Sequence, residues 1–330
     1  MILTVTLNAA LDLTYRVPRL TPHASHRVRD VSERPGGKGL NVARVLAALG
    51  HRTTVTGFAG GDTGRQLRAL LAGAASPAGA AAPAGDAEET TEPEPGRVTD
   101  ALVTTAGATR RTVGVVDEHT GDTTQLNEPG PHIAPEEWQT FLRTYTGLLR
   151  QGTEAVALCG SLPPGLPVGA YATLVKEART AGVPVLLDTS GEPLRRGLAA
   201  RPDLVKPNAE ELAGVTGTTE PLRAARAARR RGARAVVASL GSDGMLLVTA
   251  DGAWRAAVPQ RLAGNPTGAG DSAVAGLLSG LVEGLPWPDR LARAVALSAA
   301  TVLAPAAGEF DAAAYARLLP SVPVEQTGTG

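Results

Sequence analysis

The stretch Asn265–Leu281, NPTGAGDSAVAGLLSGL, combines a glycine turn, an acid and a helical pattern. Gly268, Ala269 and Gly270 leave the turn almost without side chains, so its N–H groups can approach a bound group closely. Asp271 follows directly, and the apolar residues after it repeat at the spacing of one buried helix face. A helix N-terminus attracts anions because its first N–H groups are unpaired and its dipole is positive there. The stretch predicts either an anion site or an ordinary turn in which Asp271 caps the helix.

The composition is that of a large globular chain with no excess of positive charge. The 330 residues are 43% hydrophobic and 19% charged, which suits one α/β domain with a smaller appendage. Lysine plus arginine and aspartate plus glutamate each number 32, which argues against nucleic acid and anionic membranes as partners. One cysteine, Cys159, excludes an intrachain disulfide and a multi-cysteine metal site. Without a basic leader or a long apolar segment, the chain is expected to be soluble and cytoplasmic.

Short β-rich runs alternate with helical patterns along most of the chain. Strands are expected at 2–7, 52–60, 155–160, 183–188, 203–208 and 235–241, and helices at 39–50, 62–71, 135–150, 167–181, 208–216 and 220–231. This alternation predicts a mostly parallel sheet covered by helices on both faces. Ligands bind such sheets beyond the carboxyl ends of the strands. Those ends carry Asp188, Lys206, Asn208, Ser239 and Gly241.

Two segments depart from this alternation. Residues 72–96 are rich in alanine, proline and glycine and then acidic, so they are predicted to form a flexible insert with nothing bulky to bury. Residues 98–129 contain three β-like runs joined by turns. Together with residues 12–34 they are predicted to form a small, discontinuous β lid over the main sheet. The αβα core would then comprise 1–11, 35–97 and 130–330.

A second glycine cluster, RPGGKGLNVARVL, begins another helical pattern. Gly36 and Gly37 permit close backbone approach, Lys38 adds a positive charge, and Asn41 adds an amide one turn later. The cluster is not a Walker loop, because glycine and not serine or threonine follows the lysine, and it is not a dinucleotide fingerprint. Judged alone, it is best explained as a tight turn with a solvated lysine.

Polar groups follow several other predicted strands. Asp12 is either a ligand for sugar hydroxyls or a turn aspartate. In KPNAEEL, Asn208 and Glu211 either form a capping box or hold a hydrated Mg²⁺ through their oxygens. Other predicted strands also end in glycine or in a polar residue, at Gly160, Ser161 and Asp188. The ASLGSDG loop, with Ser239, Gly241 and Gly244, has so few large side chains that a nucleotide could lie against it.

The order of these motifs resembles that of the ribokinase-like PfkB carbohydrate kinases, in particular the 1-phosphofructokinase and tagatose-6-phosphate kinase branch: TLNAALD, GGKGLNVARVL, TRRTV, NEPGP, GSLPPG, DTSG, KPNAEEL, SLG and GAGDS. The similarity runs over residues 2–304 and is broken mainly by the insert. It implies a three-layer αβα fold with a mostly parallel sheet and a β lid, ATP as donor and Mg²⁺ as cofactor. It also implies an anion hole at 268–270 and Asp271 as general base, which suits phosphoryl transfer.

The resemblance sorts the candidate residues by role. Catalysis falls to Asp271, Gly268, Ala269 and Gly270; acceptor binding to Asp12, Gly36, Gly37, Lys38, Asn41, Arg110 and Ser161; nucleotide binding to Lys206, Asn208, Ser239, Gly241 and Gly244; and metal binding to Asn208, Glu211 and Asp188. Lys38 and Arg110 would hold a phosphate already on the sugar, because two cations suit a dianionic ester. The alternative for Arg110 is a solvated strand edge.

Some positions differ from the usual pattern of the branch without removing a catalytic group: Thr112, Cys159, Pro266, Thr267 and Leu297. We expect an ATP-dependent kinase that converts fructose 1-phosphate to fructose 1,6-bisphosphate, with tagatose 6-phosphate or fructose 6-phosphate as alternative acceptors. A non-catalytic sugar-phosphate sensor is the alternative from another class, and a dehydrogenase is disfavoured by the missing fingerprint. The resemblance also makes a homodimer through the lid plausible.

Overall fold

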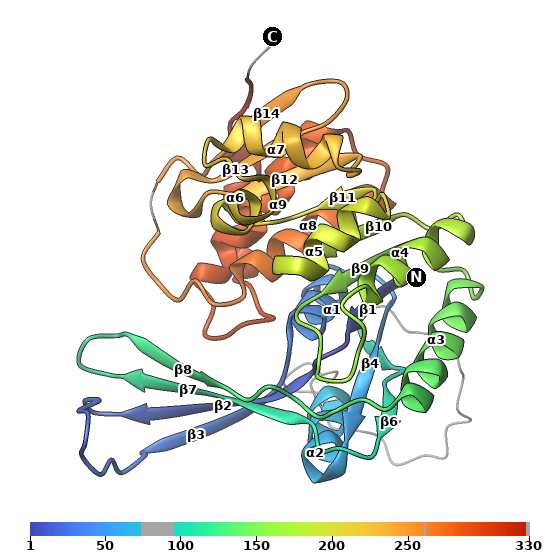
Figure 1. Cartoon of the computed structure of the whole chain (residues 1–330). Coiled ribbons are helices and arrows are strands. Elements are labelled where there is room, and N and C mark those ends of the chain that lie inside the picture. Colours follow the sequence, from blue (N-terminus) through green and yellow to red (C-terminus); the bar gives the residue numbers. More distant parts are fainter. Residues whose placement is uncertain (74–95, 261, 328–330) are drawn as a thin grey trace, which may run out of the picture.

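A large, mostly parallel sheet forms the centre of the protein (Figure 1). The structure is a computed structural model and describes residues 1–73, 96–260 and 262–327. The strands of this sheet are β1 Ile2–Thr6, β4 Thr53–Gly60, β5 Val98–Asp100, β6 Val103–Thr105, β9 Ala155–Cys159, β10 Val185–Asp188, β11 Leu204–Val205, β12 Ala235–Ser239, β13 Met245–Val248, β14 Ala253–Ala256 and β15 Val324–Gln326. Their order is β5-β4-β1-β9-β10-β11-β12-β13-β14-β15, with β6 paired to the other end of β4. The pairings from β5 to β12 are parallel, and those from β12 to β15 are antiparallel.

Helices cover both faces of the sheet, which confirms the predicted three-layer αβα fold. They are α1 Lys38–Ala48, α2 Gly61–Gly73, α3 Pro135–Leu149, α4 Ala170–Thr180, α5 Gly191–Ala199, α6 Ala209–Thr216, α7 Pro221–Arg230, α8 Ala269–Val282, α9 Trp287–Val302 and α10 Ala312–Leu318. Buried side chains of α3 to α7 pack on one face, and those of α1, α8 and α9 pack on the other. Among the described residues, no helix combines the length and apolar character needed to cross a bilayer.

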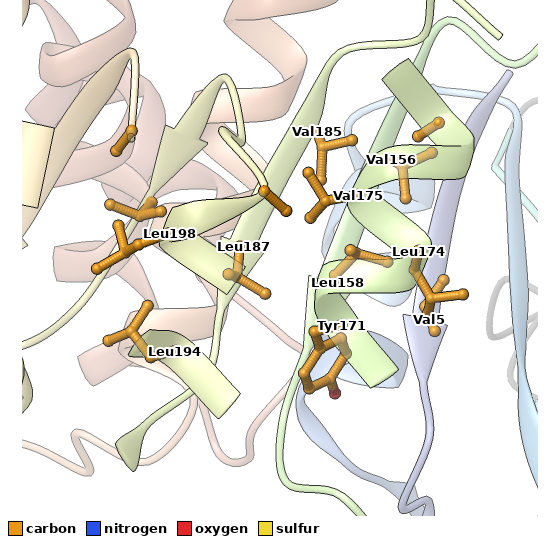
Figure 2. Packing of buried hydrophobic residues seen from close by; sticks show 14 of the residues in the cluster. Val5, Val156, Leu158, Tyr171, Leu174, Val175, Val185, Leu187, Leu194 and Leu198 are labelled. Atoms are coloured by element: carbon orange, nitrogen blue, oxygen red, sulfur yellow. The ribbon is translucent and has the colours of Figure 1, made fainter. Parts of the chain in front are cut away.

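The two halves of the core are divided by the alternation of side chains along each strand. In β9, Val156 and Leu158 point toward α4 and share a cluster with its buried side chains (Figure 2). Ala155 and Ala157 belong to the cluster on the opposite face. Since a strand directs successive side chains to opposite faces, a strand buried on both faces is mostly apolar. This explains the apolar runs of β9 and β10, whereas β1 and β4 also bury small polar side chains, all of them threonines.

A separate four-stranded sheet projects from the body as the lid (Figure 1). Its strands are β2 Ala10–Val17, β3 Asp30–Gly36, β7 Arg110–Asp117 and β8 Thr123–Asn127, in the order β3-β2-β7-β8. β2 pairs parallel with β7, and the outer pairings are antiparallel. The lid therefore combines two segments about a hundred residues apart, and β2 carries Asp12 to its base.

One boundary of the predicted lid is wrong. Residues 98–105 were expected in the lid, but β5 and β6 pair with β4 in the large sheet. The reason is that β4 is buried along its whole length, and its outer edge needs partners for its backbone groups. The predicted insert begins inside α2, which extends to Gly73, and residues 74–95 lie outside the described part of the chain.

Candidate active site

The turn that begins α8 offers unpaired backbone amides. Gly268 is the N-cap of this helix, with φ of 85°, and a Cβ there would lie 2.8 Å from Ala307. Glycine is thus required by both conformation and space. The Ala269 N–H donates to the Pro266 carbonyl at 3.1 Å, whereas the N–H groups of Gly268 and Gly270 have no partner within the described residues. The turn can therefore receive an anion through Gly268 and Gly270, while the amide of Ala269 is used within the turn.

Asp271 stands in the first turn of α8, with only 7% of its surface exposed. Its Oδ2 accepts a hydrogen bond of 2.8 Å from Nδ2 of Asn41, which lies one turn into α1. Burial, followed by the nearby charge of Asp188, raises the pKa of Asp271 from 3.8 to about 6, and Lys38, Asn41 and Lys206 limit the rise. A carboxylate with a pKa near neutrality is suited to accept a proton from an alcohol.

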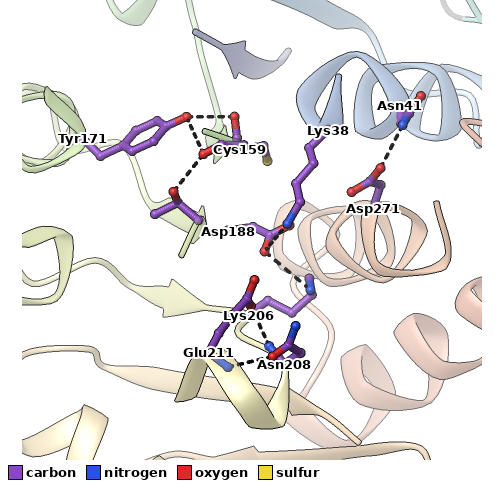
Figure 3. Close-up of polar contacts among 11 residues, drawn as sticks. Lys38, Asn41, Cys159, Tyr171, Asp188, Lys206, Asn208, Glu211 and Asp271 are labelled. Atoms are coloured by element: carbon purple, nitrogen blue, oxygen red, sulfur yellow. Dashed lines mark hydrogen bonds and ion pairs between the residues drawn. The ribbon is translucent and has the colours of Figure 1, made fainter. Parts of the chain in front are cut away.

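Two lysines converge on the buried carboxylate of Asp188 at the end of β10 (Figure 3). Lys38 Nζ lies 3.3 and 3.4 Å from its two oxygens, and Lys206 Nζ lies 3.5 Å from Oδ1. Burial alone would lower the pKa of Lys38, but the charges of Asp188 and Asp271 outweigh it and raise the pKa above its ordinary value. A Cβ on Gly270 would lie 3.5 Å from Lys206 Nζ, so this ammonium group adjoins the unpaired amides. The arrangement places two ammonium groups near the turn at 268–271, where the carboxylates of Asp188 and Asp271 balance them.

The three predicted metal ligands have different partners in the structure. Asp188 is ion-paired with two lysines, whereas Asn208 and Glu211 form the capping box of α6. Asn208 Oδ1 accepts from the Glu211 N–H at 2.7 Å, and a Glu211 oxygen accepts from the Asn208 N–H at 2.9 Å. Within the described ranges, no group of three or more acidic, histidine or cysteine side chains converges on one point. The second oxygen of Glu211 still fits Mg²⁺, which usually keeps several waters and needs only one or two carboxylates besides substrate phosphates.

A pocket of about 610 Å³ opens beside residues 268–270, the candidate anion-binding turn. Six candidate residues line it: Asn208, Ser239, Gly241, Gly244, Ala269 and Gly270. Apolar side chains from α9 and from the residues between β14 and α8, among them Val258, Val295 and Val302, supply much of the remaining wall. A slightly larger hollow of about 660 Å³ at α7 touches none of the candidate residues. The smaller pocket joins an apolar wall, suited to a flat ring system, to amides suited to phosphate groups.

Asp12 faces the site from the base of the lid. Thr112, directly opposite on β7, donates a hydrogen bond to Asp12 Oδ1. A Cβ on Gly36 would lie 2.0 Å from the Asp12 carboxyl group, so only glycine fits at that position. Burial raises the pKa of Asp12, while the hydrogen bond from Thr112 and the charge of Arg110 oppose the rise. Gly37 caps α1 with φ of 115°, and a Cβ there would lie 2.7 Å from Thr6.

Arg110 lies on the lid side of the site, and its partners differ from those of Lys38. Its Nε donates to the Asn8 carbonyl at 3.2 Å, and its Nη1 donates to the Glu128 carbonyl at 3.1 Å. The side chain of Asn8 in turn donates to Ser161 Oγ at 3.0 Å. Asn8 thus links Arg110 to Ser161, a role that the sequence analysis missed. The available signal was a polar residue at the end of an apolar strand.

The sequence profile described as "pfkB family carbohydrate kinase" matches residues 4–75 and 98–313. A 1-phosphofructokinase from Rhodobacter capsulatus is 39% identical over 311 residues, which cover 92% of each chain. Phosphofructokinase-2 from Escherichia coli, solved in complex with fructose-6-phosphate, is similar in structure with a TM-score of 0.81 and 29% identity over 96% of this chain and 98% of that one. A possible 1-phosphofructokinase from Thermotoga maritima gives a TM-score of 0.85 and 25% identity over 99% and 100% of the two chains. The chain is therefore an enzyme that belongs to the PfkB family of carbohydrate kinases.

Proposed function

We propose that this kinase transfers the γ-phosphoryl group of ATP to a hydroxyl of a sugar phosphate, with fructose 1-phosphate as the acceptor and fructose 1,6-bisphosphate as the product. One observation carries the proposal. The buried carboxylate of Asp271 and the unpaired amides of Gly268 and Gly270 lie in one helical turn. A base for an alcohol thereby adjoins a cradle for the phosphoryl group that the alcohol attacks. The 39% identity to a 1-phosphofructokinase supports the choice of acceptor.

The donor side of the reaction uses the pocket beside α8. The nucleotide base would lie against the apolar wall near Val295, with the phosphates directed toward the turn at 268–270. Charge that develops on the transferred group would be compensated by the two free amides and the nearby ammonium groups of Lys206 and Lys38. Glu211, with Asn208, is suited to hold Mg²⁺, which when bound neutralises charge on the nucleotide phosphates.

The acceptor side uses the base of the lid. Asp12 would accept hydrogen bonds from sugar hydroxyls, with Gly36 and Gly37 allowing close approach, while Asn41 orients Asp271 as it removes the proton. Arg110 and Ser161 would bind the phosphate already on the sugar. Lys38 was expected to share that role, but its partners Asp188 and Asp271 favour contact with the transferred group instead.

Turnover of a panel of sugar phosphates tests this assignment. ADP release is measured with fructose 1-phosphate, fructose 6-phosphate, tagatose 6-phosphate and fructose at equal concentrations. The highest kcat/KM is expected for fructose 1-phosphate, with fructose itself far behind because it has no phosphate for Arg110. Fructose 6-phosphate is the second candidate acceptor. Phosphofructokinase-2 from Escherichia coli, which is 29% identical to this chain, was solved in complex with it. Binding of a sugar phosphate without any ADP release would instead support a non-catalytic sensor.

The lid also supports a proposed homodimer. Val31 on β3 and Leu126 on β8 are 52% and 60% exposed, although both are large apolar side chains. A second copy packed on the lid would cover them, and burial of such surface favours association. Sedimentation of the wild type and of a Val31→Asp, Leu126→Asp variant should give a dimer and a monomer, respectively. A monomeric wild type at micromolar concentration would contradict the proposal.

A further inference from the structure

The loop between α9 and α10 connects the lid to the catalytic core through one carboxylate. Glu309 Oε1 accepts from Nη2 of Arg44, on α1, at 3.0 Å, and it also accepts from Nη1 of Arg34, on lid strand β3. Arg44 further donates from Nη1 to the Ala307 carbonyl at 3.1 Å. The Arg44 side chain is only 13% exposed, and both other side chains are 34% exposed. Glu309 is therefore a shared acceptor for two arginines from different parts of the fold.

The same loop supports the anion-binding turn. Ala307 lies against Gly268 so closely that a Cβ on that glycine would be 2.8 Å away. A Cβ on Gly308 would lie 3.0 Å from Oδ1 of Asn41, the residue whose amide binds Asp271. A shift of residues 307–308 would therefore displace both the turn and the partner of the proposed base.

The lid end of this connection leads to the acceptor site. Arg34 is the direct neighbour of Asp12 in the β2–β3 register, and Gly36, two residues later, contacts the Asp12 carboxyl group. The charge of Arg44 also acts on Asp12 and limits the rise in the pKa of the Asp12 carboxyl group. Glu309 thus stands between the strand that presents the acceptor and the turn that receives the phosphoryl group.

We infer that Glu309 is a positioning residue that couples the lid to the anion-binding turn. It touches no proposed substrate position, so its effect would be exerted through Arg34 and Arg44. The proposed reaction needs the acceptor hydroxyl in line with the transferred phosphoryl group, and misplacement by about 1 Å can cost about 10²-fold in rate. Glu309 maintains this alignment by fixing β3 relative to residues 307–308. The inference rests on the proposed function for its kinetic consequences.

A double-mutant cycle tests the kinetic part. Glu309→Gln keeps the size of the side chain and removes its charge, and Arg34→Met removes the lid partner. Each single variant should lower kcat/KM for the acceptor by about 10-fold and leave KM for ATP nearly unchanged. The double variant should be no more than about twofold worse than either single one. Losses that simply multiply would overturn the coupling.

A matched control comes from another partly exposed ion pair. Arg68 Nη1 lies 2.5 Å from Asp100, with 28% and 29% side-chain exposure, at the outer edge of the large sheet. Arg68→Met should leave the kinetic constants within about twofold of the wild type. An equal loss of kcat/KM in this control and in Glu309→Gln would show a general effect of ion-pair removal and would contradict a positioning role.

Hydrogen exchange gives a readout that does not depend on any substrate. In Glu309→Gln, amides of β2 and β3 and amides in the segment 266–272 should exchange faster together, whereas those of β12 should be unchanged. Faster exchange in the lid alone, or in neither segment, would overturn the inference. Since this measurement needs no turnover, failure of the proposed acceptor assignment and failure of the Glu309 coupling are separately detectable.

Discussion

The core half and the lid half of the candidate site are held together by different interactions. In the core half, Asp188, Lys206 and Asp271 are all buried. With Lys38 they set two ammonium groups against two carboxylates. In the lid half, Asp12 and Arg110 belong to a projecting sheet: Asp12 accepts from Thr112 on β7, and Arg110 donates to the carbonyl of Asn8, between β1 and β2. Buried charges are strongly coupled because water screens them little, whereas partly exposed groups interact more weakly. We therefore expect changes in the core half to affect kcat and changes in the lid half to affect KM for the acceptor.

The largest effect is expected at Asp271. Asp271→Asn keeps the size of the side chain and a group that can contact Asn41, but it cannot accept the acceptor's proton. Turnover should fall by about 10²–10⁴-fold, the usual contribution of a positioned base. The nucleotide affinity, measured by calorimetry, should remain close to that of the wild type because the pocket is lined by other residues. A loss of turnover below tenfold would remove Asp271 from the role of base.

A comparison of the two cations sharpens the division between the halves. Lys38→Met should mainly lower kcat, because Lys38 is paired with Asp188 and lies near Asp271 in the core half. Arg110→Met should mainly raise KM for the acceptor, because Arg110 lies beside Asn8 and Ser161 at the lid base. Each effect should be about 10–100-fold, in the range of a hydrogen bond to a charged group. Measured kcat and KM with one sugar phosphate separate the two outcomes.

The reverse assignment has a clear kinetic signature. If Lys38→Met raises KM for the acceptor as much as Arg110→Met does, both cations bind the phosphate already on the sugar. Loss of kcat in Arg110→Met would instead assign Arg110 to contact with the transferred phosphoryl group. An unphosphorylated sugar provides the control, since its KM should respond little to Arg110→Met.

The acid limb of the pH profile is expected to report the core half. As the proposed base, Asp271 would act only when ionised, and burial raises its pKa to about 6. Activity should therefore be full above this pH and fall about tenfold for each unit below it. A limb near pH 4 would contradict a buried base. The profile of kcat/KM, with stability checked at each pH, gives the measurement.

The same pKa shift predicts a stability effect of opposite sign to the activity effect. Because the folded state favours protonated Asp271, ionisation between about pH 4 and pH 6 lowers wild-type stability. Asp271→Asn should therefore be more stable than the wild type at pH 7.5, by about 1–3 kcal/mol, and the gain should vanish below pH 4. Denaturant unfolding at the two pH values checks this. If the stability difference between Asp271→Asn and the wild type is the same at both pH values, the gain does not come from the ionisation of Asp271.

Sequence patterns were most informative where structure depends on local spacing or on complete burial. The apolar runs predicted the core strands, and the capping box was one of two interpretations of the spacing of Asn208 and Glu211. The three-residue strands β5 and β6 were misplaced because such short segments carry no periodicity. The ion pair of Lys38 with Asp188 joins residues 150 positions apart, and only the three-dimensional packing shows it.

Contacts of the long loops were the least accessible to prediction. Nothing in the residues around Glu309 indicates that its partners are Arg34 and Arg44, because a lone acid in a loop is usually a solvated side chain. Asn8 is a polar residue at the end of an apolar strand, but its link between Arg110 and Ser161 joins segments that meet only in the folded chain. The large sheet was thus more predictable than the contacts that join it to the lid.

The smallest effect is expected at Thr112 in the lid half. Thr112→Val is nearly isosteric and removes the hydroxyl that donates to Asp12. The pKa of Asp12 should rise further, since this hydrogen bond lowers it. KM for the acceptor should increase by about 2–10-fold, as expected for one hydrogen bond, with kcat and KM for ATP nearly unchanged. Thr112→Ser keeps the hydroxyl and serves as the matched control. Equal constants for the valine and serine variants would show that the hydroxyl does not orient Asp12, whereas a loss of kcat in the valine variant alone would show that the lid half contributes to the chemical step.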